Sequence, residues 1–439
     1  MQSQYKVRGS SASTIAADVE DAIRDGRLAP GTQLPTVRAV AVQLGVSPTT
    51  VSAAYRTLRN RGFVSAHGRR GTQVSRRPPL TAGAFPVVPP GLRDLAYGNP
   101  DPALLPSLGA AFKRVSRGPR LYGEAKNHPE LLRLAAAQLA ADKIPTEALA
   151  VFGGALDAIE RVLQAWLRPG DRVAVEDPGY ASIFDLLGAL GLVPEPVGVD
   201  ERGARPAEVE RALGTGARAL ILTPRAQNPT GAAFDRERVR ALTRALAAHP
   251  DVLVIEDDHA GPVAGAPALT LSAARTRWAV VRSVSKSLGP DLRLAIMAGD
   301  PTTIARVEGR QHLGAGWVSH VLQGLVAALW ADPATEQKLE TARRTYARRR
   351  EALVRALGER GLTAYGATGM NVWIPVPEEA RAVHALAAAG FAVRAGEPHR
   401  LRSAPAVRVT IATLRSKDAA RVADVLAAAF APASLTAPA

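Results

Sequence analysis

The chain has 439 residues, more than one ordinary domain holds, and it is 47% apolar and 22% charged, the composition of a soluble globular protein. It contains no cysteine, which excludes disulfides, thiolate metal sites and cysteine nucleophiles, and it has no apolar run long enough for a membrane helix. The first ten residues lack the apolar core of a signal peptide, so we expect a cytoplasmic protein.

The basic charge is concentrated near the N-terminus. The formal net charge is +15, and residues 1–77 alone carry +8. Residues 26–77 include nine arginines and no aspartate or glutamate. Such a segment suits a polyanion, so we predict that it binds nucleic acid. A solvated face in an arginine-rich protein is the alternative, but it leaves the missing acids unexplained.

Three helices are predicted in this basic segment and just before it. Apolar residues recur at helical spacing over residues 15–23 and indicate the first helix. Thr36 is a candidate cap for the second helix, and Gly45 ends it. Ser47 and Pro48 open the third helix, with serine as the N-cap and proline at the first helical position. Two short helices joined by a tight glycine turn predict a helix-turn-helix, whose second helix fits the DNA major groove.

Two short strands are predicted after the third helix, at residues 63–67 and 72–76, joined by the basic tip 68–71. A hairpin with a basic tip is a wing suited to contacts with the DNA backbone or the minor groove.

These elements resemble the winged helix of the GntR family of bacterial repressors. The segments that carry the resemblance are Leu34-Pro35-Thr36-Val37-Arg38, Leu44-Gly45-Val46-Ser47, Thr50-Val51, Ala54-Tyr55, Leu58 and Gly62. The resemblance implies that the DNA-facing residues are Arg38, Ser47, Thr49, Thr50, Arg69, Arg70 and Gly71. An ordinary surface arginine is the alternative for Arg38. Pro48 stands where the family usually has an arginine or another polar residue, and proline offers no donor there.

Residues 78–91 contain five prolines and show neither helical nor strand periodicity. This composition predicts an extended linker between two domains. We therefore expect a DNA-binding domain at residues 1–77 and a large domain at residues 92–439, with a C-terminal subdomain from near residue 330.

In the large domain, short apolar runs alternate with helical segments, a pattern typical of a parallel sheet flanked by helices. The predicted strands are 172–175, 219–222, 252–255 and 278–281, and the polar clusters that follow them are 177–180, 223–231, 256–259 and 283–293. Ligands bind beyond the carboxyl ends of strands in open α/β sheets. The four clusters are therefore expected to form one site.

Lys286 lies in the last of these clusters. Only seven of the 55 basic residues are lysine, and a lysine, unlike an arginine, can lose its proton and form a Schiff base. The cluster predicts that Lys286 holds an aldehyde cofactor as an imine, with the cofactor's phosphate bound by Ser283, Ser285 and Arg293. A solvated loop lysine is the alternative that this stretch alone leaves open.

The other clusters offer partners for pyridoxal phosphate (PLP), a cofactor of this kind. Asp257 could pair with the protonated pyridine nitrogen, and Gly154 begins a helix whose amides could receive the phosphate. Tyr180 could stack on the ring and Asn228 could bond its phenolic oxygen, although a core tyrosine and a turn asparagine are the ordinary alternatives. Arg408 lies in a late predicted strand and could clamp a substrate carboxylate.

In this order, the residues resemble fold-type I aminotransferases, over about 340 residues from the segment Tyr97-Gly98-Asn99-Pro100-Asp101 to the strand around Arg408. The resemblance implies Lys286 as the Schiff-base lysine and Arg408 as the carboxylate clamp. The remaining PLP contacts it implies are Tyr122, from the neighbouring subunit, and Gly154, Ala155, Tyr180, Asn228, Asp257, His259, Ser283, Ser285 and Arg293. His259 replaces a tyrosine typical of the family; it can still donate a hydrogen bond, and we expect it to titrate near neutrality.

A winged helix joined to an aminotransferase-like domain resembles the MocR subfamily of GntR regulators. The implied fold is α/β: a winged helix-turn-helix plus a fold-type I domain with a mostly parallel central sheet and a smaller C-terminal α+β subdomain. The implied function is a PLP-dependent transcription regulator that binds a double-stranded DNA operator and forms a homodimer through the large domain. It would sense PLP, alone or with an amino compound, and we expect no metal site.

Two other functions fit the same residues. One is an active aminotransferase with an accessory DNA-binding domain, and the other is a sensor of PLP alone that controls vitamin B6 supply. The domain fusion favours regulation over catalysis, although residual aminotransferase chemistry is compatible with Lys286, Asp257 and Arg408.

Overall fold

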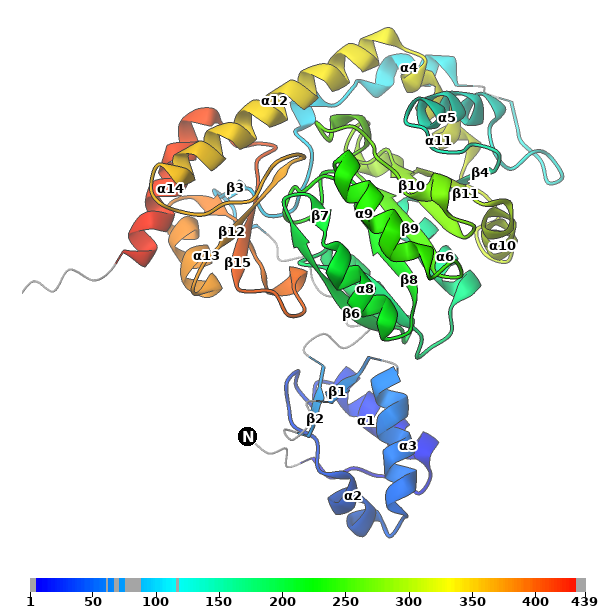
Figure 1. The fold of residues 1–439 in the computed structure, drawn as a ribbon, viewed down its shortest axis with the longest axis vertical. Helices are drawn as coiled ribbons and strands as arrows, with labels where there is room; N and C mark the ends of the chain where they lie inside the picture. Colours follow the sequence, from blue (N-terminus) through cyan, green and yellow to red (C-terminus); the bar gives the residue numbers. More distant parts are fainter. Residues whose placement is uncertain (1–4, 61, 67–70, 76–87, 116–117, 432–439) are drawn as a thin grey trace, which may run out of the picture. The chain divides into compact units, whose positions relative to one another are not determined.

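A computed structural model describes residues 5–60, 62–66, 71–75, 88–115 and 118–431 (Figure 1). Arg69 and Arg70 at the predicted wing tip, and residues 78–87 of the predicted linker, lie outside the described residues. Within the described part of the chain, no helix is long and apolar enough to cross a membrane.

The N-terminal residues form the predicted winged helix. Its elements are α1 (Ala12–Arg24), α2 (Val37–Leu44), α3 (Pro48–Asn60), β1 (Val64–Ala66) and β2 (Thr72–Val74). The two strands pair antiparallel, with Val64 opposite Val74. One hydrophobic core joins α1, α2, α3 and the hairpin, and it buries the predicted stripe of Val51, Tyr55 and Leu58. The predicted helix-turn-helix and hairpin are therefore confirmed.

Capping side chains set the helix boundaries in the helix-turn-helix. The Thr36 side chain accepts a hydrogen bond from the amide of Ala39, and Gly45 ends α2 with φ at 64°. Ser47 Oγ accepts from the Thr50 amide at 3.1 Å and opens α3. The turn between α2 and α3 is tight because glycine adopts this left-handed conformation without a steric cost.

The large domain is built on a central sheet of eight strands. They are β4 (Leu149–Phe152), β5 (Arg172–Asp177), β6 (Val193–Asp200), β7 (Gly203–Ala204), β8 (Ala217–Leu222), β9 (Leu253–Asp258), β10 (Trp278–Ser283) and β11 (Ala295–Gly299). The strand order is β4-β11-β10-β9-β8-β5-β6-β7. Strands β8, β9 and β10 run parallel, and β11 is antiparallel to both of its neighbours. All four predicted strands are present, as β5, β8, β9 and β10.

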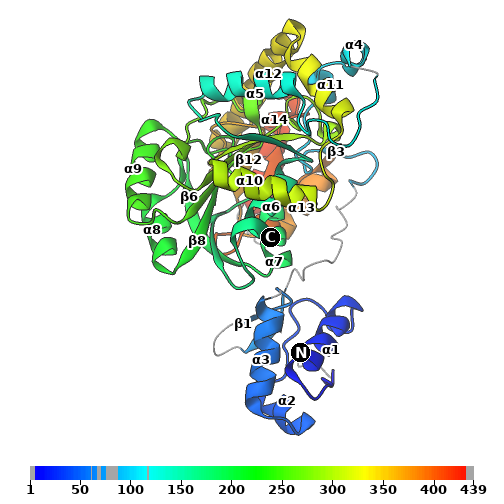
Figure 2. The same ribbon diagram turned by 90° about the vertical axis from the view of Figure 1, so that its right-hand side faces the viewer.

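Helices cover both faces of this sheet. Helices α8 (Pro206–Gly214) and α9 (Arg236–Ala247) lie on one face, and α6 (Ala155–Trp166) lies on the other (Figures 1 and 2). Helix α10 (Pro301–His312) lies on the same side as α6 in Figure 2. The sheet is therefore the middle layer of three. Because helices cover its two faces, a ligand site can form at the ends of its strands.

Strand β9 extends further than the sequence predicts. It continues through Glu256, Asp257 and Asp258, because its parallel register with β10 continues to the pairs Asp257–Val281 and Asp258–Arg282. The three acids are thus the last residues of the strand rather than the loop after it. The rigid sheet, and not a loop, positions their side chains.

The chain contains further helices, several of them in the C-terminal part. The α-helices are α4 (Leu108–Arg114), α5 (Pro129–Ala141), α7 (Ala181–Ala189), α11 (His320–Trp330), α12 (Pro333–Gly358), α13 (Glu379–Ala388) and α14 (Ser416–Phe430), and the 3-10 helices are η2 (Pro102–Leu104), η3 (Gly261–Val263), η4 (Ser272–Ala274), η5 (Pro290–Leu292) and η6 (Glu397–His399).

The C-terminal part has a small antiparallel sheet of its own, in the order β12-β15-β14. Its strands are β12 (Asn371–Pro375), β14 (Arg394–Ala395) and β15 (Ala406–Thr410), and a separate parallel pair joins β3 (Arg93–Asp94) to β13 (Phe391–Ala392). The long helix α12 extends from the α4–α11 region to α14, as Figure 1 shows. Together with the central sheet, this arrangement confirms the predicted fold class.

Candidate functional site

A cavity of about 180 Å³ lies at the carboxyl ends of β9 and β10. Ten of the predicted PLP and substrate residues line it: Ala155, Tyr180, Asn228, Asp257, His259, Ser283, Ser285, Lys286, Arg293 and Arg408. The fold therefore brings together side chains that are more than 250 residues apart in the sequence. Tyr122 does not line this cavity; its side chain is 91% exposed and makes an edge contact with the Trp317 ring at 5.5 Å.

Lys286 is held inside the cavity by a backbone contact. Its Nζ atom donates to the carbonyl oxygen of Gly98 at 2.7 Å. Burial, together with the nearby charge of Arg408, lowers the pKa of Lys286 to about 8. A lysine with this pKa has an appreciable neutral fraction near neutral pH, and the neutral amine is the nucleophilic form.

Asp257 is a buried carboxylate with an unfilled hydrogen-bonding position. Its side chain is 4% exposed, and its Oδ1 atom has no hydrogen-bond partner among the described residues. Burial and the charge of Asp258 raise the pKa of Asp257 to about 7, although the charge of Lys286 opposes this rise. A buried acid of this kind is costly without a donor, so it suits a cationic N–H group brought in by a ligand.

Asp258, the next residue, is fully paired. It accepts hydrogen bonds from Arg225 at 2.8 Å through both oxygens and from Arg282 Nε at 2.7 Å. Burial opposes its ionisation, but the two guanidinium groups hold the pKa of Asp258 well below its usual range. Sequence reasoning identified neither arginine as its partner. These hydrogen bonds keep Asp258 ionised and engaged with the two arginines, whereas Asp257 lines the cavity.

His259 is neutral at physiological pH, so the prediction that it titrates near neutrality is wrong. Desolvation and the charge of Lys286 lower the pKa of His259 to about 4. Its Nε2 atom lies 2.9 Å from the carbonyl oxygen of Ala226. Because a carbonyl can only accept, Nε2 carries the proton of the neutral ring, and Nδ1 is left as an acceptor.

A polar cradle is formed by Gly154 before α6, Ser283 and Ser285 at and after the end of β10, and Arg293 between η5 and β11. Ser283 Oγ donates to Ser285 Oγ at 3.0 Å, and the Ser285 amide donates back to Ser283 Oγ at 3.2 Å. Arg293 reaches over the N-terminus of α6, where its Nη2 lies 3.4 Å from the carbonyl oxygen of Gly153. A Cβ on Gly154 would come within 2.9 Å of the same guanidinium. Hydroxyls, a guanidinium and a helix N-terminus in one place suit a phosphate group.

Arg408 and Asn228, which also line the cavity, are hydrogen-bonded to each other. Arg408 Nη1 donates to Asn228 Oδ1 at 3.1 Å, and Nη2 donates to the carbonyl oxygen of Ala96. Burial and the charge of Arg394 lower the pKa of Arg408 to about 10, so it stays protonated. Because its oxygen is engaged, Asn228 has its amide NH₂ left to donate to a ligand.

Asn371 also lines the cavity, and sequence reasoning missed it. Its Nδ2 approaches Asn228 Oδ1 at 3.4 Å, and its Oδ1 accepts from the Thr410 hydroxyl at 2.9 Å. The only sequence feature that could have pointed to it is a polar residue at the start of the apolar strand β12.

The predicted DNA-facing residues lie at the start of α3 and on α2. Arg38, Ser47 and Thr49 are exposed, and Thr50 is half-buried. Ser47 Oγ lies 3.1 Å from Thr49 Oγ1 and 2.8 Å from Thr50 Oγ1, which gathers three hydroxyls at one helix N-terminus. Gly71 directly precedes β2 with φ at 81°.

Comparison with known proteins identifies both parts of the chain. Residues 91–426 match the aminotransferase class I and II family, and residues 11–74 match the bacterial regulatory proteins of the gntR family. The vitamin B6 salvage pathway transcriptional repressor PtsJ of Salmonella typhimurium is 43% identical over 419 residues, which cover 94% of this chain and 96% of that protein. The chain belongs to the MocR subfamily of GntR-type transcription regulators.

Other relatives agree with this assignment. The pyridoxine biosynthesis transcriptional regulator PdxR of Corynebacterium glutamicum is 30% identical over 368 residues, covering 79% of this MocR regulator and 78% of PdxR. Among solved structures, an archaeal alanine:glyoxylate aminotransferase superposes with a TM-score of 0.70 at 24% identity, covering 77% of this chain and 90% of that chain. That structure shows the shared fold. The family prediction is confirmed.

The cavity of this MocR regulator fits the cofactor that its aminotransferase-type fold implies. Asp257 Oδ1 has no hydrogen-bond partner in the part of the chain that the structure describes, the cradle at Arg293 and Gly154 suits a phosphate, and Lys286 offers a primary amine of lowered pKa. The part of the chain that the structure describes holds no group of three or more histidine, aspartate or glutamate residues that could bind a metal.

Replacing Asp257 with asparagine should change how the stability of the cofactor-free protein depends on pH. The folded pKa of Asp257 is about 7, against roughly 3.9 for an exposed aspartate. At a pH between these two pKa values, Asp257 is protonated in the folded protein and ionised in the unfolded chain. The free energy of unfolding of the wild type therefore falls by about 1.4 kcal/mol per pH unit as the pH rises. Asparagine has nearly the shape of a protonated aspartate but does not titrate. The stability of Asp257→Asn should therefore lack this part of the pH dependence.

Urea unfolding of the cofactor-free proteins from about pH 5 to pH 7 measures the effect. Asp251→Asn is the matched control, because the Asp251 side chain is 84% exposed. We expect its profile to follow the wild type. If the free energy of unfolding changed with pH in the same way for the wild type and Asp257→Asn, Asp257 would not be protonated in the folded protein over this pH range.

Proposed function

We propose that this MocR regulator binds PLP on Lys286 and that PLP occupancy controls its affinity for a DNA operator. The observation that carries the proposal is that one cavity holds both the Lys286 amine of lowered pKa and the buried carboxyl group of Asp257, whose Oδ1 has no hydrogen-bond partner among the described residues. A pyridine ring that carries an aldehyde can bond to the lysine amine through the aldehyde and donate a hydrogen bond to Asp257 from its protonated ring nitrogen.

Each group in the cavity has a task in holding the cofactor. When bound, PLP supplies an aldehyde that condenses with a primary amine and a pyridine nitrogen that carries a proton. Lys286 provides the amine, and Asp257 accepts the hydrogen bond of the protonated ring nitrogen. Ser283, Ser285 and Arg293 bind the phosphate, with the amides at Gly154 and Ala155, where α6 begins, behind them.

The remaining polar residues orient the ring and receive an amino compound. Asn228 donates its amide to the ring's phenolic oxygen while its own oxygen stays on Arg408. Tyr180 lines the same cavity and stacks on the ring. Arg408 keeps its charge and has a buried Nε without a partner among the described residues, so it can receive a carboxylate. We propose that PLP is the primary effector and that an amino acid-like compound can modulate it.

Regulation requires that the cofactor bind two conformations unequally. We propose a homodimer in which the exposed Tyr122 reaches the site of the neighbouring subunit, so that occupancy of the cavity is coupled to dimer geometry. The two winged helices of such a dimer would contact two half-sites of one operator through α3, Arg38 and the wing. The names of PtsJ and PdxR both refer to vitamin B6, and we propose that the operator controls genes of vitamin B6 supply.

Chromatin immunoprecipitation in cells limited for or supplied with vitamin B6 tests this function. We expect the regulator at promoters of genes for vitamin B6 synthesis or uptake, with an occupancy that changes with the supply. In cells carrying Lys286→Ala the occupancy should not respond. A wild-type occupancy that ignores the supply would exclude PLP as the effector.

A further inference from the structure

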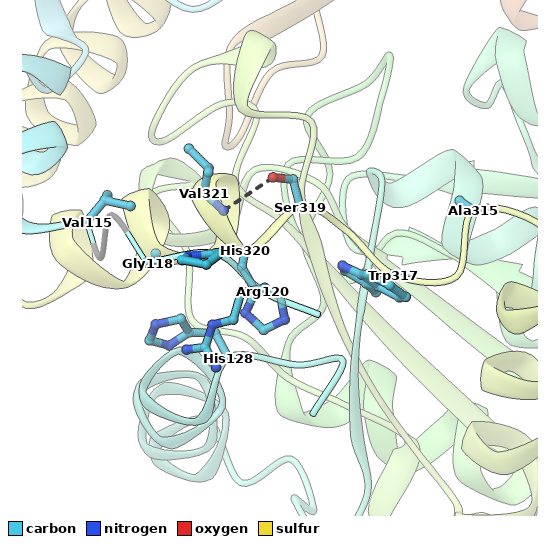
Figure 3. A pocket seen from close by; sticks show the side chains of 11 residues that line it. Val115, Gly118, Arg120, His128, Ala315, Trp317, Ser319, His320 and Val321 are labelled. Atoms are coloured by element: carbon cyan, nitrogen blue, oxygen red, sulfur yellow. Dashed lines mark hydrogen bonds between the residues drawn. The ribbon is translucent and has the colours of Figure 1, made fainter. Parts of the chain in front are cut away.

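Histidine side chains line two cavities of the large domain. Figure 3 shows His128 and His320 at a cavity of about 510 Å³, which shares no lining residue with the Lys286 cavity. His259 lines the Lys286 cavity itself. His259 is therefore the histidine placed to contact a cofactor bound on Lys286 of the same subunit, and the contacts described above for PLP do not use it.

His259 lies close to the residues that would surround the phenolic oxygen of a bound ring. Its Nε2 atom is 2.9 Å from the carbonyl oxygen of Ala226, two residues before Asn228. The charge of Lys286 is one of the causes that lower the pKa of His259, so these two side chains are near neighbours. In PLP the phenolic oxygen is on the ring carbon next to the one that carries the aldehyde. A ring bonded to Lys286 and to Asn228 therefore presents this oxygen beside His259.

The hydrogen bond to Ala226 decides what His259 can offer to the ring. A carbonyl oxygen only accepts, so the single proton of the neutral imidazole is on Nε2. The other nitrogen, Nδ1, then carries a lone pair and can only accept. Moving the proton to Nδ1 would leave the lone pairs of Nε2 and of the carbonyl oxygen facing each other at 2.9 Å.

The charged groups around His259 disfavour a cationic imidazole. Desolvation and then the charge of Lys286 lower the pKa of His259 to about 4, and the charge of Arg408 also lowers it. The charge of Asp258 acts in the opposite direction, but this carboxylate is already hydrogen-bonded to two arginines. If the imine nitrogen on Lys286 were protonated, its charge would replace that of the ammonium group. His259 therefore meets the ring as a neutral acceptor.

We propose, on the basis of the PLP binding to Lys286 set out above, that His259 keeps the phenolic oxygen of bound PLP protonated. The phenolic hydroxyl donates to Nδ1 of His259, and the imine nitrogen on Lys286 stays neutral. In the alternative form the same proton is on the imine nitrogen, and a phenolate oxygen faces the Nδ1 lone pair. Because two acceptors repel each other, His259 favours the form with the neutral imine.

This effect suits a sensor of PLP better than an enzyme. An incoming amino compound displaces Lys286 by bonding its nitrogen to the imine carbon, while the bond between that carbon and the lysine nitrogen breaks. Protonation of the imine nitrogen accelerates the attack, because it draws electrons from the carbon. An imine held neutral by His259 would therefore exchange slowly, and PLP would remain on Lys286.

The absorption spectrum of the PLP-loaded, full-length protein near neutral pH tests the proposal, after free PLP has been removed. The form with the neutral imine absorbs in the near ultraviolet, whereas the form with the protonated imine and the phenolate is yellow. The wild type should absorb mainly in the near ultraviolet. His259→Tyr restores the tyrosine typical of aminotransferases and offers a donor to the phenolic oxygen. It should raise the ratio of the yellow form to the near-ultraviolet form by roughly fivefold or more, the change expected from one net hydrogen bond.

His259→Phe distinguishes an acceptor from a donor at this position, because phenylalanine is neither. If His259 accepts, its loss should also raise the share of the yellow form, by roughly fivefold. If His259 donated instead, its loss would lower that share. His384→Tyr, on the exposed side of α13, is the matched control and should keep the wild-type spectrum.

The rate of reduction by cyanoborohydride is a second readout, because this reagent reduces protonated imines much faster than neutral ones. Reduction of PLP onto Lys286 should be slowest in the wild type and in His384→Tyr. It should be roughly fivefold faster in His259→Tyr and His259→Phe. A variant that is merely less stable would release PLP rather than react faster, so the rate separates the proton's position from a loss of structure.

A yellow wild type whose spectrum and reduction rate match those of His259→Tyr would overturn the proposal and leave PLP binding on Lys286 intact. If the variants lose PLP, the wild type alone decides, because a mainly yellow wild type contradicts an acceptor at His259. A wild type that retains no PLP and gives no adduct on Lys286 would refute the proposed function itself, and with it this role of His259.

Discussion

Lys286→Ala should abolish the capture of PLP by borohydride and leave the fold intact. Lys286 is the only lysine among the residues that line the first cavity, and its Nζ is held inward by the Gly98 carbonyl. Reduction fixes the bond between the lysine nitrogen and the cofactor carbon, so the adduct marks the residue that held the cofactor. Peptide mass spectrometry after reduction should find the adduct on Lys286 in the wild type and no adduct in the variant.

Lys417→Ala is the matched control, because Lys417 is exposed on α14 and should not affect trapping. Circular dichroism should give the same spectrum for the wild type and both variants. An adduct on another lysine of the wild type, or an undiminished adduct in Lys286→Ala, would refute the assignment of the Schiff-base residue.

Arg69→Ala combined with Arg70→Ala should weaken operator binding and flatten its dependence on salt. Each protein contact to a DNA phosphate contributes about 0.9 to the slope of log affinity against log salt, so loss of two contacts should lower the slope by about 1.8. At low salt the affinity itself should fall by tenfold or more. Arg38→Ala, at the exposed start of α2, should remove about one further contact.

Arg27→Ala is the control for nonspecific loss of positive charge. Its guanidinium bonds Asp25 at 3.1 Å and Tyr5 at 3.3 Å, so it is already used within the domain. Fluorescence anisotropy over a range of salt concentrations measures the slopes. An unchanged slope in the double variant would mean that the wing tip does not touch DNA.

Features set by a few neighbouring residues were predictable from the sequence. Thr36, Gly45 and Ser47 cap or end their helices in the structure, because side-chain caps and left-handed glycines act within a single turn. The predicted strands β5, β8, β9 and β10 all form, because short apolar runs bounded by polar clusters indicate buried strands. The Lys286 cluster was found because lysine is rare in this chain and can do chemistry that arginine cannot.

Features set by tertiary neighbours were not predictable. The end of β9 depends on its register with β10, so three acids belong to the strand although strands usually avoid them. The neutral state of His259 follows from burial beside Lys286, which the sequence does not display. Asp258 meets Arg225 and Arg282 only because strands from distant segments lie side by side in the sheet.

Operator affinity, measured for PLP-free protein, PLP-loaded protein and Lys286→Ala with added PLP, is the most direct test of a PLP-responsive regulator. Coupling between two sites is typically about 1–3 kcal/mol, so PLP should change the affinity of the wild type by roughly five- to 150-fold. Lys286→Ala should show the affinity of the PLP-free protein with or without the cofactor. An amino-group transfer assay on the same samples, with pyruvate and 2-oxoglutarate as acceptors, should detect little or no turnover. Equal operator affinity in all three forms, together with rapid turnover of any amino acid, would contradict regulation by PLP and make the protein an aminotransferase.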